Sequence, residues 1–373
     1  MDSQPLHQYQ ISGLKFTSNL KAFESRKRIE RIRNNNSLIY PLISLNNLSV
    51  ASGVDYGTLH KIVERNPYYK GYFPIQRKKH KKSSKVRELY SVSPDLYQVQ
   101  TWILKNILNF VPLHHSSFAY QKNKSIVQCA SQHIGASWAI KLDLHNFFGS
   151  IDEKTIYTIF YSLGFTPLLS FELARICTIQ GSRSYDSNKQ YSIHEYKDYS
   201  VGYLPQGSPT SGALSNIVFK EIDSEIQEFA TKNSLIYTRY SDDIMLSGID
   251  EYSKKSCVMI ISAVEEIIKR HRFTLQNKKT KIISPNRRIN ILGLTLKDEC
   301  VDLRSDWKQR LLMQIRFTKN LGIVKAAEFF GFKSPINYIN HINGKIHFAQ
   351  SVNRDFADFC VQRWKSEVGE LYE

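Results

Sequence analysis

Cysteine is scarce in this sequence, and its five cysteines lie far apart: Cys129, Cys177, Cys257, Cys300 and Cys360. No Cys-x-x-Cys pair occurs, so neither a zinc-binding motif nor a disulfide framework is predicted. Reduced thiols fit this pattern, and a cytoplasmic location is expected.

Long apolar runs are also missing. No stretch approaches the ~18 apolar residues that a transmembrane helix requires. The first ten residues, MDSQPLHQYQ, lack the apolar segment of a secretory signal. Neither a membrane span nor a signal peptide is therefore expected, and no internal repeat is visible.

Acidic residues are too few to balance the basic ones. The 373 residues include 51 Lys and Arg against 34 Asp and Glu, a net charge of +17. Such an excess indicates a polyanionic partner, with nucleic acid as the first candidate and an anionic membrane surface as the second. A basic protein whose charge serves only solubility is the remaining alternative. Hydrophobic residues make up 42% of the chain, which excludes a disordered protein.

Hydrophobic spacing divides the chain into helices and strands. Apolar residues three and four apart predict helices, in residues 45–63, 94–110 and 257–270 and from Asp302 onward. Residues 1–36 are polar and end in a charge run over 21–33, which predicts a helix with a solvated face, with direct RNA contact as the alternative. Alternating apolar residues predict strands, in a hairpin over 72–92 with a lysine-rich tip, in 138–144, in a hairpin over 235–248, and in 289–296. Residues 181–201 are polar and rich in Ser and Tyr, which predicts a surface loop.

Three carboxylates follow apolar strands. Asp242 and Asp243, in YSDD, suit the tip of the hairpin over 235–248, and Asp143 ends the strand AIKLD. Neighbouring carboxylates repel one another unless cations lie between them. Since Mg²⁺ prefers oxygen ligands, these residues predict a site for two Mg²⁺ ions that serves phosphoryl transfer.

The segment LPQGSPTSGALSN, residues 204–216, combines Gly207, two prolines and small residues ahead of a predicted helix. Such a backbone allows a ligand to approach closely. Gln206 adds both a donor and an acceptor, although in isolation the segment is an ordinary turn before a helix.

The segments KLDLHNFFGSI, LPQGSPTSGALSN and YSDD, in this order, resemble motifs A, B and C of reverse transcriptases. With the basic hairpin that ends in Lys85-Val86-Arg87, the resemblance covers about residues 69–350. Within the family the chain most resembles bacterial retron reverse transcriptases. Its QCASQH resembles their Asn-Ala-x-x-His element, with Cys129 in place of Asn, and Ile291-Leu292 stands where Val-Thr is usual.

The resemblance implies a right-hand polymerase of the α+β class, with an antiparallel palm sheet backed by helices. An N-terminal helical region would cover residues 1–68, fingers and palm 69–300, and a helical thumb 301–373. A helix that follows Ser305, its expected N-cap, would present Leu311, Leu312 and Ile315 to the thumb core.

The resemblance also assigns roles to single residues. Asp143, Asp242 and Asp243, with the Leu144 carbonyl, would bind the two metal ions and carry catalysis. Phe148 would exclude a ribose 2′-OH, whereas Phe147 fits a core position. The residues that would contact the incoming deoxynucleotide are Arg77, Arg87, Gln206, Gly207 and Lys279, with Lys281 as the alternative to Lys279.

The implied function is RNA-directed DNA synthesis on a dedicated structured noncoding RNA, with a branched RNA–DNA product (msDNA), in a bacterial cytoplasm. RNA would be bound by His133, Arg304, Lys308 and Arg310, although His133 also fits a structural histidine. A separate effector protein, a role in anti-phage defence and no membrane partner are expected. The alternatives are another bacterial defence reverse transcriptase, a group II intron type, which the missing endonuclease and maturase extensions disfavour, and a catalytically silent RNA-binding scaffold.

Overall fold

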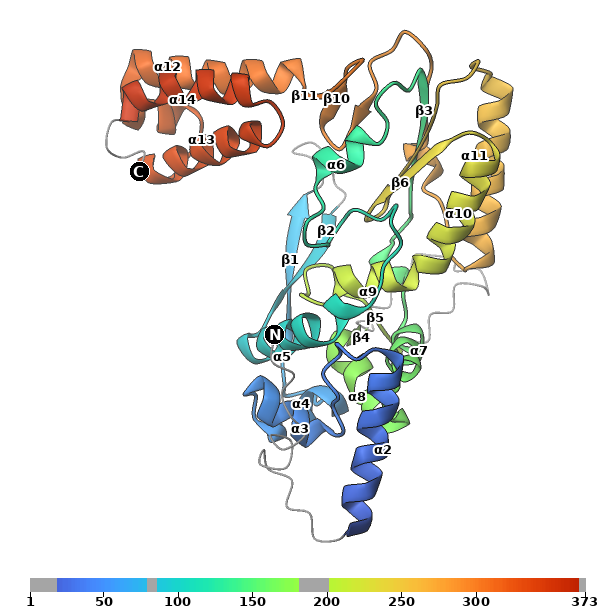
Figure 1. Ribbon diagram of the computed structural model, residues 1–373. Coiled ribbons are helices and arrows are strands. Elements are labelled where there is room, and N and C mark those ends of the chain that lie inside the picture. Colours follow the sequence, from blue (N-terminus) through green and yellow to red (C-terminus); the bar gives the residue numbers. More distant parts are fainter. Residues whose placement is uncertain (1–18, 79–85, 181–200, 369–373) are drawn as a thin grey trace, which may run out of the picture. The chain divides into compact units, whose positions relative to one another are not determined.

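The computed structural model describes residues 19–78, 86–180 and 201–368 (Figure 1). The chain forms two compact units. The first contains residues up to 122, 144–226 and 265–276, and the second contains 123–143, 227–264 and 277 onward. The lysine-rich tip at 79–85 and the predicted loop over 181–200 lie outside the described residues.

The first unit is mainly helical, and its helices begin where the sequence supplies caps. Asp55, Asp152 and Thr166 each accept a hydrogen bond from the backbone three residues later. The predicted helix over 45–63 is in fact two helices, because Gly53 takes a left-handed conformation (φ 72°) that ends the first. The helices are α2 (Asn19–Asn35), α3 (Leu45–Ser52), α4 (Tyr56–Glu64), α5 (Pro94–Asn106), α7 (Glu153–Ser162), α8 (Pro167–Cys177) and α9 (Ser211–Val218), with 3₁₀ turns η1 (Leu108–Phe110) and η2 (Phe148–Ser150).

Two antiparallel strand pairs complete this unit. The predicted hairpin over 72–92 is confirmed as β1 (Tyr72–Lys78) and β2 (Val86–Val92). A short pair, β4 (Ile179–Gln180) and β5 (Gly202–Tyr203), brackets residues 181–200. The segment that follows β5 therefore begins at a backbone position that the pairing of β4 with β5 holds in place.

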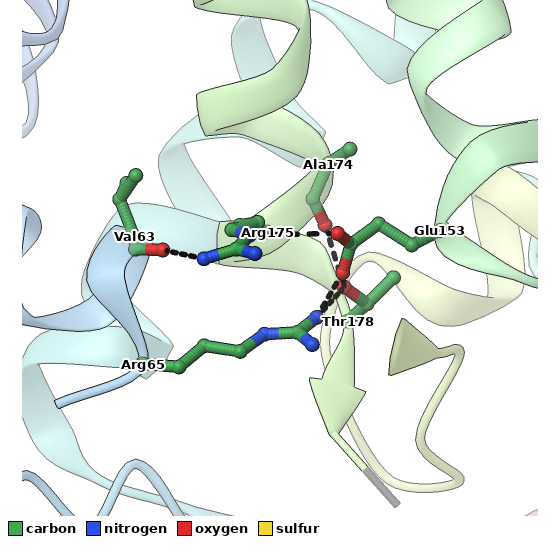
Figure 2. Close-up of polar contacts among 6 residues, drawn as sticks. All are labelled: Val63, Arg65, Glu153, Ala174, Arg175 and Thr178. Atoms are coloured by element: carbon green, nitrogen blue, oxygen red, sulfur yellow. Dashed lines mark hydrogen bonds and ion pairs between the residues drawn. The ribbon is translucent and has the colours of Figure 1, made fainter. Parts of the chain in front are cut away.

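A buried ionic cluster joins α4, α7 and α8 (Figure 2). Arg65, the residue that ends α4, donates to the Glu153 carboxylate and to Thr178 Oγ1 at 3.2 Å. Thr178 Oγ1 donates to Glu153 Oε2 at 2.9 Å, and Arg175 Nε lies 3.5 Å from Glu153 Oε1. A Cβ at Gly202 would overlap Arg65 and Glu153, so the β5 backbone lies directly against the cluster.

The second unit contains a four-stranded antiparallel sheet in the order β6-β7-β3-β8. Its strands are β3 (Trp138–Asp143), β6 (Ile236–Tyr240), β7 (Asp243–Gly248) and β8 (Lys281–Ile283). Helix α6 (Ile126–Ser131) packs on it, with Ala130 in one buried cluster with Ala139 and Met245. Two helices, α10 (Lys220–Lys232) and α11 (Lys254–Arg270), have residues in both units.

The predicted single strand over 289–296 is wrong. This segment folds as two short strands, β9 (Asn290–Ile291) and β10 (Leu294–Leu296), which pair with β11 (Val301–Leu303) in a second antiparallel sheet. Leu292 (φ 51°) and Gly293 (φ 85°) form the tight turn between them. Hydrophobicity alone did not reveal this turn, because Leu292 is itself apolar.

Three helices form the C-terminal bundle: α12 (Ser305–Phe329), α13 (Pro335–Gln350) and α14 (Arg354–Val368). Leu311 and Ile315 lie in its core beside Tyr338 and Trp364, and Leu312 packs against this cluster, as predicted. The N-cap prediction is wrong by one residue, because α12 begins at Ser305 and Arg304 caps it without a side-chain bond. At Gly322 (φ 78°) the helical path of α12 is interrupted.

The predicted fold class, α+β with antiparallel sheets backed by helices, is confirmed. In the part of the chain that the structure describes, no helix is long and apolar enough to cross a membrane. The subdomain boundaries at 68/69 and 300/301 stay a prediction.

Candidate active site

Three carboxylates gather at one end of the four-stranded sheet. Asp143 is the last residue of β3, and its cross-strand partner is Asp243, the first residue of β7. Asp242 occupies the turn between β6 and β7. The strands that carry them have buried apolar side chains, such as Leu142 and Ile244, which fix the register. The structure thus brings the three predicted catalytic aspartates together.

The turn that carries Asp242 has a strained backbone, which a hydrogen bond from a buried arginine stabilises. Ser241 takes a left-handed conformation (φ 60°), which is uncommon for a residue other than glycine. The fully buried guanidinium of Arg239 donates to the Ser241 carbonyl at 3.0 Å. Strained backbone of this kind persists where the surrounding structure holds it, and it is frequent at functional sites.

Lysines neutralise two of the three carboxylates. Lys279 Nζ lies 2.7 and 2.6 Å from the two carboxylate oxygens of Asp143, and Lys141 Nζ lies 3.0 Å from Asp243 Oδ1. Burial raises the pKa of Asp242, and the nearby charges of Asp143 and Asp243 raise it further. The site therefore concentrates negative charge that its own lysines offset only in part.

A divalent metal ion fits this donor set in charge and in donor type. Carboxylate oxygens are the ligands that Mg²⁺ prefers, and cations already pair with Asp143 and Asp243. Within the described residues, no group of three or more His, Cys, Asp or Glu side chains is arranged so that it could bind a metal ion as it stands. Lys279 lies within hydrogen-bond distance of both Asp143 oxygens, the atoms that a metal ion would bind there.

His133 lies in the core, so the prediction that it contacts RNA is wrong. Its side chain is 0% exposed. Its Nδ1 and Nε2 lie 2.7 Å from Ser247 Oγ and Thr238 Oγ1, respectively. Burial lowers the pKa of His133 to about 4, so the ring is neutral at pH 7. Because Thr238 and Ser247 lie on β6 and β7, His133, which follows the end of α6, ties this part of the chain to the hairpin that carries Asp242 and Asp243.

A groove of about 770 Å³ in the first unit is lined by the predicted gate residue Phe148 and by the predicted nucleotide contacts Gln206 and Gly207. The Gln206 carbonyl accepts from Tyr90 N–H at 2.8 Å. Gly207 (φ 114°) lies so close to the Tyr90 backbone that a Cβ would overlap its carbonyl oxygen. Only glycine fits there, because both the conformation and the contact exclude a side chain. The other lining residues are Leu89, Leu104, Lys105, Asn109, Tyr120, Lys122, Ser208, Pro209, Ser211, Gly212 and Ala213.

The two adjacent phenylalanines differ as predicted. Phe147 is buried in a cluster of rings with Phe219 and Phe273. Phe148 is only half-buried and faces the groove. Leu144 is buried and its backbone pairs with Leu275, while a metal-binding role for its carbonyl stays a prediction.

The remaining predicted contacts lie on two other elements. Arg77 and Arg87 are cross-strand partners in the β1–β2 hairpin, so their backbones lie side by side. In the C-terminal bundle, Arg304 and Arg310 are exposed and both pair with Asp306. Lys308 is only 22% exposed and its Nζ lies 2.7 Å from Asp302 Oδ1, which gives it a structural task as well.

Two residues of these sites were not predicted from the sequence. Lys141 was missed, although it stands two residues before Asp143 on the same side of an apolar strand. Tyr120 was missed too, since a left-handed conformation (φ 58°) leaves no pattern in a single sequence.

Residues 78–296 match the family model for reverse transcriptase (RNA-dependent DNA polymerase). The chain is 28% identical to the retron Ec86 reverse transcriptase of Escherichia coli, over 82% of this chain and 86% of that protein. It is 26% identical to the retron Mx162 reverse transcriptase of Myxococcus xanthus, over 74% of this chain and 57% of that protein. A foamy viral protease–reverse transcriptase structure with double-stranded DNA matches with a TM-score of 0.40 and 14% identity, over 81% of this chain and 43% of that one. The chain therefore belongs to the reverse transcriptase family, is of the retron type, and is an RNA-directed DNA polymerase.

Proposed function

We propose that this polymerase copies a dedicated structured RNA into DNA, with Asp143, Asp242 and Asp243 as its catalytic residues. The observation that carries the proposal is the meeting of these three carboxylates at one sheet end, on the segments that match the reverse transcriptase family. The net charge of +17 suits a nucleic-acid template and product.

The three aspartates are proposed to hold two Mg²⁺ ions, with the Leu144 carbonyl as a further ligand. When bound, such ions activate the attacking hydroxyl and neutralise charge on the triphosphate. The raised pKa of Asp242 is one support, because a cation relieves the repulsion that burial and its neighbours cause. Lys279 already lies at Asp143, which favours it over Lys281 as the residue that neutralises or protonates the leaving pyrophosphate.

Selection of the nucleotide is proposed to depend on the groove. Gln206 and Gly207 contact the incoming deoxynucleotide, and the half-buried Phe148 ring excludes a ribose 2′-OH. Arg77 and Arg87 bind the triphosphate, for which a planar guanidinium is well suited. The close packing of Gly207 on Tyr90 supports this assignment, because a rigid backbone places a ligand reproducibly.

The product is proposed to be a branched molecule in which DNA is joined to RNA. This part of the proposal, like the separate effector and the role in anti-phage defence, rests on the similarity to retron reverse transcriptases. Exposed basic residues of the C-terminal bundle, Arg304 and Arg310, are proposed to contact the RNA.

Sequencing the nucleic acid that co-purifies with the protein tests this function. The wild-type protein is expected to carry one structured RNA joined to DNA complementary to part of it. The Asp143→Asn variant is expected to carry the same RNA without the DNA. Recovery of unrelated RNAs only, with no DNA on any of them, would refute a dedicated template.

A further inference from the structure

Tyr120 is an exposed aromatic residue in an unusual backbone conformation. Its side chain is 53% exposed, and its φ of 58° places it in the left-handed region. Bulky residues adopt this conformation rarely and at a cost in energy. Tyr120 also lines the same groove as Phe148, Gln206 and Gly207.

The Tyr120 ring contacts the proposed gate residue. Its centroid lies 6.1 Å from that of Phe148, with the two planes at 64°, which is an edge-to-face contact. The ring centroids of Phe148 and Phe147 are also only 5.4 Å apart, and Phe147 is buried in the core. The half-buried Phe148 ring is therefore held by one buried ring and by one exposed ring.

Gly212, in the second position of α9, makes room for the Tyr120 ring. A Cβ at this position would lie only 2.5 Å from Tyr120 Cγ and 2.8 and 2.9 Å from its two Cδ atoms. These atoms belong to the fixed base of the ring, so an alanine at 212 would displace the whole ring. The tyrosine and the glycine thus fit each other across the groove wall.

We propose that Tyr120, seated on Gly212, is a positioning residue that fixes the Phe148 ring and so sets the discrimination against ribonucleotides. This inference rests on the proposed gate role of Phe148. A ring that excludes a single hydroxyl must be held to within a fraction of an ångström, and Phe148 contacts the groove-lining Tyr120 as well as the buried Phe147. Without the contact from Tyr120, Phe148 has freedom to rotate away and admit the 2′-OH.

The test compares single-nucleotide incorporation of a ribonucleotide and the matching deoxynucleotide on an RNA template, as the ratio of their kcat/KM values. Tyr120→Ala is expected to raise this ratio about two- to tenfold, as expected for loss of one edge-to-face aromatic contact. Tyr120→Phe keeps the ring and is expected to keep the wild-type ratio. Gly212→Ala is expected to raise the ratio without altering Tyr120 itself, because the added methyl group displaces the Tyr120 ring from Phe148.

The matched control is Tyr97→Ala, which removes a tyrosine of similar exposure (57%) on α5 that does not line the groove. It is expected to leave the ratio unchanged. Tyr120→Ala in the Phe148→Ala background is expected to add nothing, since two residues that act through one contact are not additive.

The outcomes separate the inference from the proposed gate. If Phe148→Ala raises the ratio and neither Tyr120→Ala nor Gly212→Ala does, the positioning role is overturned and the gate stands. An additive effect of Tyr120→Ala in the Phe148→Ala background also overturns it. If Phe148→Ala itself leaves the ratio unchanged, the gate fails and the inference fails with it.

Discussion

The buried carboxylate of Glu153 is expected to be among the most sensitive side chains of the first unit. Its side chain is 11% exposed and lies against the guanidinium groups of Arg65 and Arg175 (Figure 2). Glu153→Ala removes a carboxylate that pairs with both of these charges in a largely buried site. Removal of one partner from a buried ion pair costs about 3–5 kcal/mol, a large share of a typical total stability.

Equilibrium unfolding in urea measures this loss. If the slope of the unfolding free energy against urea concentration is unchanged, the urea concentration at the midpoint of unfolding is expected to fall by roughly 1 M or more. Trp102, on α5, belongs to the same unit and reports on it by fluorescence. Amide hydrogen exchange is expected to rise first in α7 and α8, which the cluster joins.

Glu228→Ala is the matched control, because Glu228 forms an ion pair with Lys232 on the surface of α10. Exposed pairs of this kind contribute little, so no measurable change is expected. If Glu153→Ala and Glu228→Ala shift the midpoint equally, the cluster does not stabilise the unit and the reasoning from its burial is refuted.

Two further predictions concern His133 and the C-terminal bundle. Because the folded pKa of His133 is about 4 against an ordinary 6.5, the unfolded chain binds the proton first, and stability is expected to fall as the pH drops from 6.5 toward 4. This loss, on the order of 3 kcal/mol at about 1.4 kcal/mol per pKa unit, should be absent in His133→Gln, and equal pH profiles of unfolding would contradict it. Arg304→Ala and Arg310→Ala, which alter exposed cations, are expected to lower the preference for the cognate RNA in competition with an unrelated structured RNA at fixed salt. A uniform loss of affinity for both RNAs would place recognition elsewhere.

Local patterns in the sequence predicted most of the elements. The alternation in AIKLD and the Asp-Asp pair after a strand gave β3 and the β6–β7 hairpin, with Asp143 and Asp242 at their ends. Both patterns, the alternation and the Asp-Asp pair, involve only residues that are close together in the sequence. The prediction for residues 289–296 failed because the turn residues themselves, Leu292 and Gly293, include no polar side chain that would mark the turn.

Contacts between distant segments could not be read from the sequence. Nothing in the sequence around His133 indicates that its ring lies between two hydroxyl groups, one on β6 and one on β7. The fit of Tyr120 to Gly212 depends on two residues that are far apart in the chain. A single sequence records residue types and spacing, whereas burial and partners are decided by tertiary packing.

RNA-templated extension of a primer by Asp242→Asn tests the central claim most directly. The account predicts that this variant makes no DNA but unfolds at the same temperature as the wild type or a higher one, because burial and its neighbours already disfavour the Asp242 charge. Asp250→Asn, at an exposed aspartate beyond the end of β7, should extend the primer normally. Near-normal DNA synthesis by Asp242→Asn would contradict the assignment of the three aspartates as the catalytic centre.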